Sequence, residues 1–158
     1  MRFQNIPNVL SALLLVISAC NTGKQEEAGS IIHKTDPADC WTGPGVNQIP
    51  INEKGQQIRY GRNLIANTAY YLGPKGTVSK STNGMNCQNC HLNAGTKPWG
   101  NNYGSVASTY PTFRDRSGTI ESIEKRVNDC IERSLNGRAI NTNSKEMHAI
   151  VAYIQWLS

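Results

Sequence analysis

The sequence has little that would support a zinc site or a nucleic-acid-binding surface. Its 158 residues include only three histidines, and it has no H-x-x-x-H pattern and a single C-x-x-C pair. The second ligand pair of a structural zinc site is therefore missing. Lysine and arginine exceed aspartate and glutamate by 16 to 11, but no basic run interleaved with aromatic residues occurs, so we expect no nucleic-acid partner. The net charge of +5 instead favours anionic substrates or acidic redox partners.

No apolar stretch is long enough to cross a bilayer. Residues 9–20 form a short apolar run near the N-terminus, which is typical of the central part of a signal peptide. The run ends in Ile-Ser-Ala-Cys, and this ending resembles the lipidation site of bacterial lipoproteins. We therefore predict that Cys20 is lipidated and anchors the protein to a membrane. The alternative is an ordinary cleaved signal in which this cysteine is incidental.

Three segments follow from this interpretation. Residues 1–19 are the lipoprotein-type signal peptide, residues 20–38 are a polar, aperiodic tether, and residues 39–158 are one folded domain. The predicted location is the periplasmic side of a bacterial membrane. Asn21, rather than aspartate, follows the lipidated cysteine and favours the outer membrane.

The motif C-x-x-C-H, which attaches c-type haem, occurs at Cys87, Cys90 and His91. Two thiols at this spacing form thioethers with the two vinyl groups of one porphyrin, and the following histidine offers an imidazole nitrogen to the iron. A thioredoxin-like redox pair would need a βαβ setting, which the Gly-, Asn- and Lys-rich flanks do not provide. We predict a cytochrome c with one covalent haem c and His91 as an iron ligand.

Apolar periodicity predicts an all-α domain, a small class I cytochrome c-like fold wrapped around the haem. The three predicted helices are Glu53–Tyr71, Thr119–Asn136 and Ser144–Leu157. Asn52 is the predicted N-cap of the first helix, and Asn143 or Ser144 that of the last. Gly61 lies on the apolar face of the first helix, where we expect a close crossing with the last helix. The long loop 92–118 is expected to follow the haem edge.

The ligand on the other side of the iron is not evident from the usual position. Small cytochromes c carry a methionine ligand before their last helix, but residues 138–143 contain no methionine, histidine or lysine. Met147 lies on the apolar face of the last helix and is expected in the core, whereas His148 faces away. Met85 precedes the motif so closely that it cannot easily reach the opposite haem face. Cys130, in the middle of the second helix, remains the candidate.

The helical neighbours of Cys130 favour chemistry at its sulfur. Arg126 and Ser134 stand one turn to either side, and Arg133 follows at i+3. Cationic neighbours favour a thiolate, and a guanidinium offers a planar fork to a sulfur oxyanion. The alternative is a disulfide with Cys40, because these two thiols remain in an exported protein once the other three are assigned. Residue reasoning leaves both possibilities open.

Several short segments between Tyr60 and Ser158 form a recognisable set. They are YGR (60–62), GMNCQNCHL (84–92), AGT (94–96), YP (110–111) with Arg114 and Arg116, EKRVNDCIERSLNG (124–137), SKEM (144–147) and AYIQWLS (152–158). Together they resemble the cytochrome domain of the thiosulfate dehydrogenase family. The block C-x-x-R-S-x-N-G that begins at Cys130 is the most specific part of the resemblance.

The resemblance implies an activity and a set of site residues. Such enzymes couple two thiosulfates into tetrathionate and pass two electrons to haem. It implies that Cys130 ligates the haem iron opposite His91, and that Arg116, Arg126 and Ser134 line the substrate pocket. Characterised members carry two haems, whereas this sequence has one attachment motif. A separate electron-accepting cytochrome is therefore the expected partner.

Two other functions are compatible with the same residues. One is a membrane-tethered electron carrier whose arginines only steer a partner. The other is a haem-based sensor of sulfide, nitric oxide or carbon monoxide. For the enzyme, a cysteine–thiosulfonate at Cys130 is the expected intermediate, and the reverse reaction, tetrathionate reduction, stays open.

Overall fold

A computed structural model describes residues 40–158, which lie within one compact unit of the chain, residues 35–158. The predicted signal peptide, the tether and the lipidation site at Cys20 lie outside the described residues. Within residues 40–158, none of the helices combines the length and the apolar character needed to cross a bilayer.

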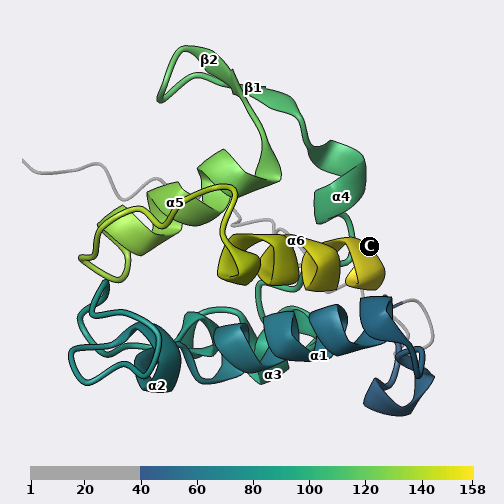
Figure 1. Cartoon of the computed structure of the whole chain (residues 1–158). Coiled ribbons are helices and arrows are strands. Elements are labelled where there is room, and N and C mark those ends of the chain that lie inside the picture. The colour runs from purple at the N-terminus through teal and green to yellow at the C-terminus, as the bar shows by residue number, and fades with distance from the viewer. Residues whose placement is uncertain (1–39) are drawn as a thin grey trace, which may run out of the picture. The chain divides into compact units, whose positions relative to one another are not determined.

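The described chain is mainly helical, as predicted, with one short β-hairpin added (Figure 1). Its elements in order are η2 (Val46–Gln48), α1 (Glu53–Ala66), α2 (Thr68–Leu72), η3 (Cys87–Asn89), α3 (Leu92–Gly95), α4 (Val106–Thr109), β1 (Thr112–Arg114), β2 (Thr119–Glu121), α5 (Ile123–Arg133) and α6 (Lys145–Leu157). The helical cytochrome c-like expectation is therefore confirmed. Figure 1 shows α6 lying between α1 and α5, which it contacts on two sides.

Helices α1 and α6 form the most extensive contact between elements, and they cross at a glycine. A Cβ atom on Gly61 would overlap the carbonyl oxygen of Ala149 and the Cβ of Tyr153. The absence of a side chain therefore lets the two backbones approach closely, as the sequence predicts. Apolar side chains of both helices fill the surrounding core: Ile58, Leu64, Ile65, Met147, Ile150, Ile154 and Leu157. Met147 is fully buried, so its predicted place in the core is confirmed.

Side-chain caps begin the three longer helices. The Asn52 Oδ1 accepts a hydrogen bond of 2.9 Å from the Gly55 N–H, which confirms the predicted N-cap. Ser144, and not Asn143, caps α6 by accepting from the Met147 N–H at 3.1 Å. The Ser122 hydroxyl does the same for α5. Each cap satisfies one backbone donor that the first helical turn leaves unpaired.

The predicted first helix is interrupted at Asn67, which has φ −127° and ψ 42° and separates α1 from α2. Two side chains compete with the helical hydrogen bonds at this position. The Thr68 hydroxyl donates to the Leu64 carbonyl at 2.7 Å, and the Asn86 Oδ1 accepts from the Ala69 N–H at 2.8 Å. The prediction of one continuous helix to Tyr71 was therefore wrong.

The predicted start of the second helix at Thr119 was also wrong. Residues Thr119–Glu121 form β2, which pairs antiparallel with β1 so that Phe113 lies opposite Ile120. The helix begins only at Ile123. Ile120 matched the helical spacing, but its β-branched side chain suits a strand equally well. The predicted loop 92–118 thus contains β1 and the short turns α3 and α4.

The crossing of α1 and α6 gives the first testable prediction. Gly61→Ala should lower the free energy of unfolding by about 1–3 kcal/mol, because overpacking outweighs the gain in helix propensity. Equilibrium urea unfolding of the haem-loaded protein, followed by far-ultraviolet circular dichroism, measures this change. The matched control is Asn63→Ala, an exposed position of the same helix, which should leave stability unchanged or slightly raised. Equal stability of the two variants would contradict the close crossing.

Candidate functional site

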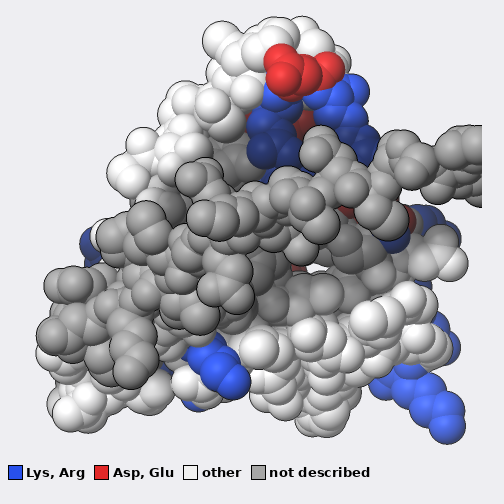
Figure 2. Space-filling model, turned by 180° about the vertical axis from the view of Figure 1, so that it is seen from behind, with Lys and Arg blue, Asp and Glu red and all other residues white. Residues whose placement is uncertain are grey.

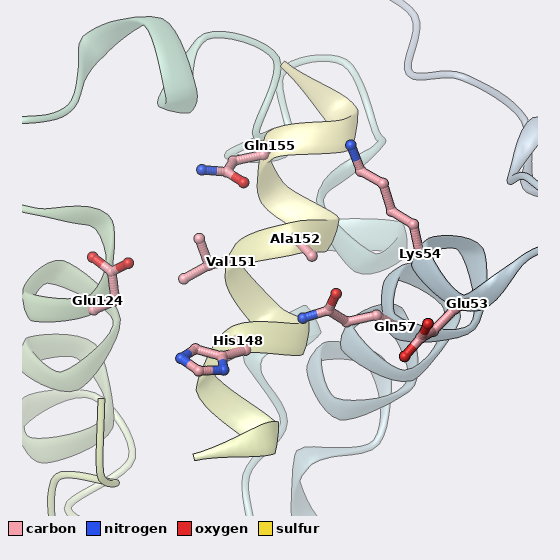
Figure 3. A pocket seen from close by; sticks show the side chains of 8 residues that line it. All are labelled: Glu53, Lys54, Gln57, Glu124, His148, Val151, Ala152 and Gln155. Atoms are coloured by element: carbon pink, nitrogen blue, oxygen red, sulfur yellow. The ribbon is translucent and has the colours of Figure 1, made fainter. Parts of the chain in front are cut away.

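A groove of about 520 Å³ lies between α1, α5 and α6, away from the haem motif (Figure 3). Its lining residues are Glu53, Lys54, Gln57, Glu124, His148, Val151, Ala152 and Gln155. Figure 3 shows Glu124 facing His148 and Val151 of α6, with the α1 side chains beyond the same helix. None of the predicted site residues lines this groove, and His148 is exposed, as predicted. It is not the site that the sequence indicates.

A second cavity, of about 430 Å³, contains the haem motif. Cys87, Cys90 and His91 lie on its wall together with Thr68 of α2. Most of the remaining lining is apolar and comes from α1, α2, α4, α5, the turn after α5, and α6: Ile65, Leu72, Val106, Ile123, Val127, Ile131, Leu135, Ile150 and Ile154. A volume within the usual range for cofactor sites, roughly 300–1,000 Å³, and an apolar lining around two thiols and an imidazole fit a covalently attached haem.

The motif is held by a 3-10 turn and by α2. The N–H groups of Cys90 and His91 both donate to the Cys87 carbonyl, at 3.2 and 3.0 Å. The Cys87 N–H in turn donates to the Thr68 hydroxyl at 3.0 Å. Thr68 is 2 % exposed, and burial raises the pKa of the Cys87 thiol. The backbone therefore presents both cysteines and the histidine to one cavity.

His91 is oriented by a hydrogen bond and by an aromatic stack. Its Nδ1 lies 2.7 Å from the Asn101 carbonyl oxygen, which can only accept, so Nδ1 carries the proton and Nε2 keeps a free lone pair. The ring stacks on Tyr103 with centroids 4.5 Å apart. Burial lowers the pKa of His91, although the Asn101 bond acts in the opposite direction. A neutral imidazole with a free Nε2 is the form that ligates iron.

The loop beyond His91 is tied to α6. Asn93 and Ala94 both have φ of 54°, so α3 is a left-handed turn rather than an ordinary helix. The Tyr153 hydroxyl of α6 donates to the Ala94 carbonyl at 3.0 Å. A side chain on Gly95 would overlap the Tyr103 ring, so the glycine lets the loop close on the ring that stacks with the histidine.

Helix α5 brings Cys130, Arg126 and Ser134 to the same cavity as the haem motif. Arg126 and Ser134 stand one helical turn before and after the cysteine, as the sequence predicts. Arg133 and residues 138–143 do not line the cavity. The Asn128 side chain instead holds this segment against α5, because it exchanges two hydrogen bonds with the backbone of Ile140, at 2.9 and 3.0 Å.

The hairpin contributes an arginine that the sequence analysis matched to the family but did not assign to the pocket. Arg114, at the end of β1, lines the cavity, whereas Arg116 is exposed in the turn between β1 and β2 and lies outside the lining. The Arg114 Nε lies 4.0 Å from Glu121 Oε2, and the other oxygen of this carboxylate is 3.7 Å from the Lys125 Nζ. The turn at Asp115 ends the strand and separates the two arginines, which sequence spacing could not show.

The cavity favours anions. Its lining includes Arg114 and Arg126 and contains no aspartate or glutamate among the described residues. Glu121 is 2 % exposed, and its Oε2 has no hydrogen-bond partner within residues 40–158. Figure 2 shows charged side chains of both signs gathered at the end of the molecule that the hairpin forms. Arg114 is thus held beside a buried carboxylate that does not line the cavity.

The described cysteines are all free thiols, so the alternative disulfide between Cys40 and Cys130 is not formed. Cys130 is half-buried on the cavity wall and is available as a ligand or nucleophile. Met85 also lines the cavity and is 40 % exposed. Although its place two residues before the motif makes the opposite haem face hard to reach, this thioether is the second sulfur on the wall, besides the Cys130 thiol, that could compete for the iron.

The helical frame, the cavity and the C-x-x-C-H motif together define a domain of the cytochrome c class. The family described as "SoxA/TsdA, cytochrome c domain" matches residues 77–158, which is more than half of the chain. The chain therefore belongs to this family. Membership implies covalently bound haem c, with which the apolar cavity and the orientation of His91 agree.

Individual proteins similar to this chain are thiosulfate dehydrogenases. The chain is 38 % identical over 115 residues to that of Psychrobacter arcticus, which covers 73 % of this chain and 34 % of the relative. It is 30 % identical over 135 residues to that of Allochromatium vinosum, covering 82 % and 48 %. The solved structure of thiosulfate dehydrogenase (TsdBA) from Marichromatium purpuratum has the same fold, with a TM-score of 0.68 and 23 % identity over 76 % of this chain and 26 % of that one. The chain thus spans between a third and a half of these curated relatives.

The ligation of the iron gives the second prediction. We expect the oxidised protein to show low-spin haem with thiolate and imidazole ligands, because the Cys130 thiol and His91 share one cavity. Cys130→Ala should remove the thiolate features from the electron paramagnetic resonance spectrum. Cys40→Ala is the matched control and should leave the spectrum unchanged. A methionine–iron charge-transfer band in the wild type that disappears in Met85→Leu would contradict thiolate ligation.

Proposed function

We propose that this chain is the substrate-oxidising domain of a thiosulfate dehydrogenase-type oxidoreductase, which joins two thiosulfates into tetrathionate. The observation that carries the proposal is the cavity of the haem motif. The Cys130 thiol lines it together with Arg126 and Arg114, and no acidic residue is among the described lining residues. Thiosulfate is a small dianion with a nucleophilic sulfur, so it fits a cationic cavity that contains a reactive thiol. The similar thiosulfate dehydrogenases support the same assignment.

The chemistry at Cys130 balances in two steps. In the first, a sulfur–sulfur bond forms between the cysteine thiolate and the terminal sulfur of thiosulfate, and two electrons leave to give a cysteine–thiosulfonate. In the second, another thiosulfate attacks the sulfur that the first thiosulfate attached to the cysteine. The bond to the cysteine breaks, tetrathionate leaves, and the thiolate is regenerated. Haem, when bound, would accept these two electrons one at a time, with a further acceptor reoxidising it in between. Cys87, Cys90 and His91 are the residues that would hold it.

The two cavity arginines have separate tasks in this proposal. Arg126 lies one turn from Cys130 and would bind the sulfonate oxygens of the thiosulfate that reacts first. Arg114 comes from a different element and would bind the second thiosulfate. Its positive charge would offset the repulsion between the two thiosulfate anions. Ser134, at the end of α5, would donate a hydrogen bond to a sulfonate oxygen. We propose Arg114 in place of Arg116, which the resemblance implies but which stands on the exposed turn.

The electrons require a further acceptor, since the chain has one haem-attachment motif. We propose a separate cytochrome as that acceptor, and membrane attachment through lipid at Cys20 would keep the domain close to membrane-bound partners. Both proposals rest on the sequence.

A function as an electron carrier without substrate is the second candidate. Met85 on the cavity wall favours it, because methionine ligation is typical of cytochromes c that only transfer electrons. The carrier would be reduced and oxidised reversibly but would not turn over thiosulfate. Ligation by Met85 and thiosulfate turnover therefore distinguish the two candidates.

The third prediction concerns thiosulfate oxidation by the haem-loaded protein with ferricyanide as electron acceptor. Cys130→Ala should abolish turnover because it removes the sulfur that reacts. Arg126→Ala and Arg114→Ala should each lower kcat/KM about ten- to a hundred-fold, the loss of one charge-assisted hydrogen bond to an anion. Steady-state kinetics measure both parameters.

Arg116→Ala is the matched control, because it removes an exposed arginine two residues from Arg114. It should change kcat/KM by no more than about twofold. A large loss in Arg116→Ala together with normal activity in Arg114→Ala would reverse the assignment of the two arginines. Absence of turnover in a wild-type protein that is reversibly reduced and oxidised would favour the carrier instead.

A further inference from the structure

Trp99 has an unusual backbone conformation and an unusual exposure. Its φ is 58°, in the left-handed region that bulky residues rarely adopt, and its side chain is 79 % exposed. Burial of the indole therefore does not explain the residue. Three backbone hydrogen bonds close the surrounding loop: Leu92 to Gly100, Gly100 to Lys97 and Lys97 to Leu92, at 3.0, 3.0 and 3.2 Å. The loop thus holds a large aromatic side chain in water, where such residues often mark contact sites.

The same loop orients His91, the predicted iron ligand. Leu92 follows the histidine directly, and the Asn101 carbonyl, two residues beyond Trp99, accepts the hydrogen bond from the His91 Nδ1. The backbone from Trp99 to Asn101 and one hydrogen bond therefore connect the indole to the imidazole. A protein that contacted Trp99 would stand at the edge of the haem site.

The charge of this part of the chain has one sign. Residues 54–114 contain seven lysines and arginines and no aspartate or glutamate: Lys54, Arg59, Arg62, Lys75, Lys80, Lys97 and Arg114. Lys97 and Lys80 are exposed. In Figure 2 the charged side chains that protrude from the lower edge of the molecule are all basic. A basic segment of this kind around the haem motif attracts acidic proteins and repels basic ones.

We propose that Trp99, together with Leu92 and Lys97, is the docking surface for a redox protein whose own docking face is acidic. Leu92 is 38 % exposed and extends the apolar contact, while Lys97 supplies charge next to it. A small apolar centre with a charged rim is typical of transient electron-transfer complexes, which need fast dissociation. The acceptor's oxidised metal gains one electron from the reduced haem iron, and no bond forms or breaks. The proposal rests on the proposed electron transfer but not on thiosulfate as the electron source.

Stopped-flow oxidation of the dithionite-reduced full-length protein tests the proposal. The probe is oxidised plastocyanin, a small copper protein with an acidic docking face. Trp99→Gly should lower the second-order rate constant about tenfold or more, which corresponds to the loss of one contact of high energy. Lys97→Glu should also lower it and weaken its dependence on ionic strength. Oxidation by ferricyanide, which needs no docking surface, should stay unchanged in both variants.

Three comparisons make the result specific. Phe113→Ala removes an aromatic side chain of similar exposure, 60 %, from the hairpin and should leave the rate constant with plastocyanin unchanged. Trp99→Gly should unfold at a urea concentration no lower than the wild type, since glycine adopts the left-handed region freely. Titration of the isotope-labelled reduced protein with reduced plastocyanin, where no electron can move, should shift the amide resonances of Leu92, Lys97 and Trp99.

An unchanged rate constant in Trp99→Gly would overturn the proposal. So would Trp99-dependent binding to phosphatidylglycerol vesicles or Trp99-dependent self-association, because these results would assign the surface to lipid or to a second copy of the chain. Electrons come from dithionite in this experiment, so failure of thiosulfate turnover has no effect on it. The two proposals can therefore fail independently.

Discussion

The close crossing of α1 and α6 at Gly61 is the constraint on which the site depends. Because the two backbones approach each other there, α6 can place the Tyr153 hydroxyl on the Ala94 carbonyl at 3.0 Å. That contact holds the left-handed turn after the haem motif, on which Tyr103 packs and stacks with His91. A missing side chain on one helix is thus linked, through a few contacts, to the orientation of the predicted iron ligand.

The electrostatics of the cavity combine attraction for anions with a local balance of charge. Arg114 and Arg126 face the cavity, and the buried Glu121 stands behind Arg114 and close to Lys125. A carboxylate in this position offsets the positive charges of Arg114 and Lys125 and does not occupy the place of a substrate. Lys125 also bonds Asp129 at 2.6 Å, which holds the pKa of that carboxyl below its usual range. The arginine that faces the cavity, Arg126, and the ion pair between Lys125 and Asp129 therefore lie on different faces of α5.

Much of the fold could be predicted because it depends on local rules. Asn52 and the helix at the C-terminus were predictable from capping and 3.6-residue periodicity. The hairpin was not, because strands of three residues are too short for an alternating pattern to differ from a helical one. The break at Asn67 was missed as well, since it depends on Asn86, a residue 19 positions later that bonds Ala69. Hydrogen bonds between distant residues leave no periodic trace in a sequence.

The sequence by itself determined the haem-attachment motif and the grouping of Arg126, Cys130 and Ser134, because residues four apart on a helix share a face whatever the helix packs against. The tertiary structure decided which cavity that face lines and which hairpin arginine joins it. Arg114 and Arg116 lie two positions apart, so a continuous strand would have pointed both the same way. The strand ends at Arg114, and the Ser117 and Gly118 N–H groups fold back onto the Arg114 carbonyl. A turn closed by hydrogen bonds, and not the spacing of the residues, therefore separates the arginine in the cavity from the one in water.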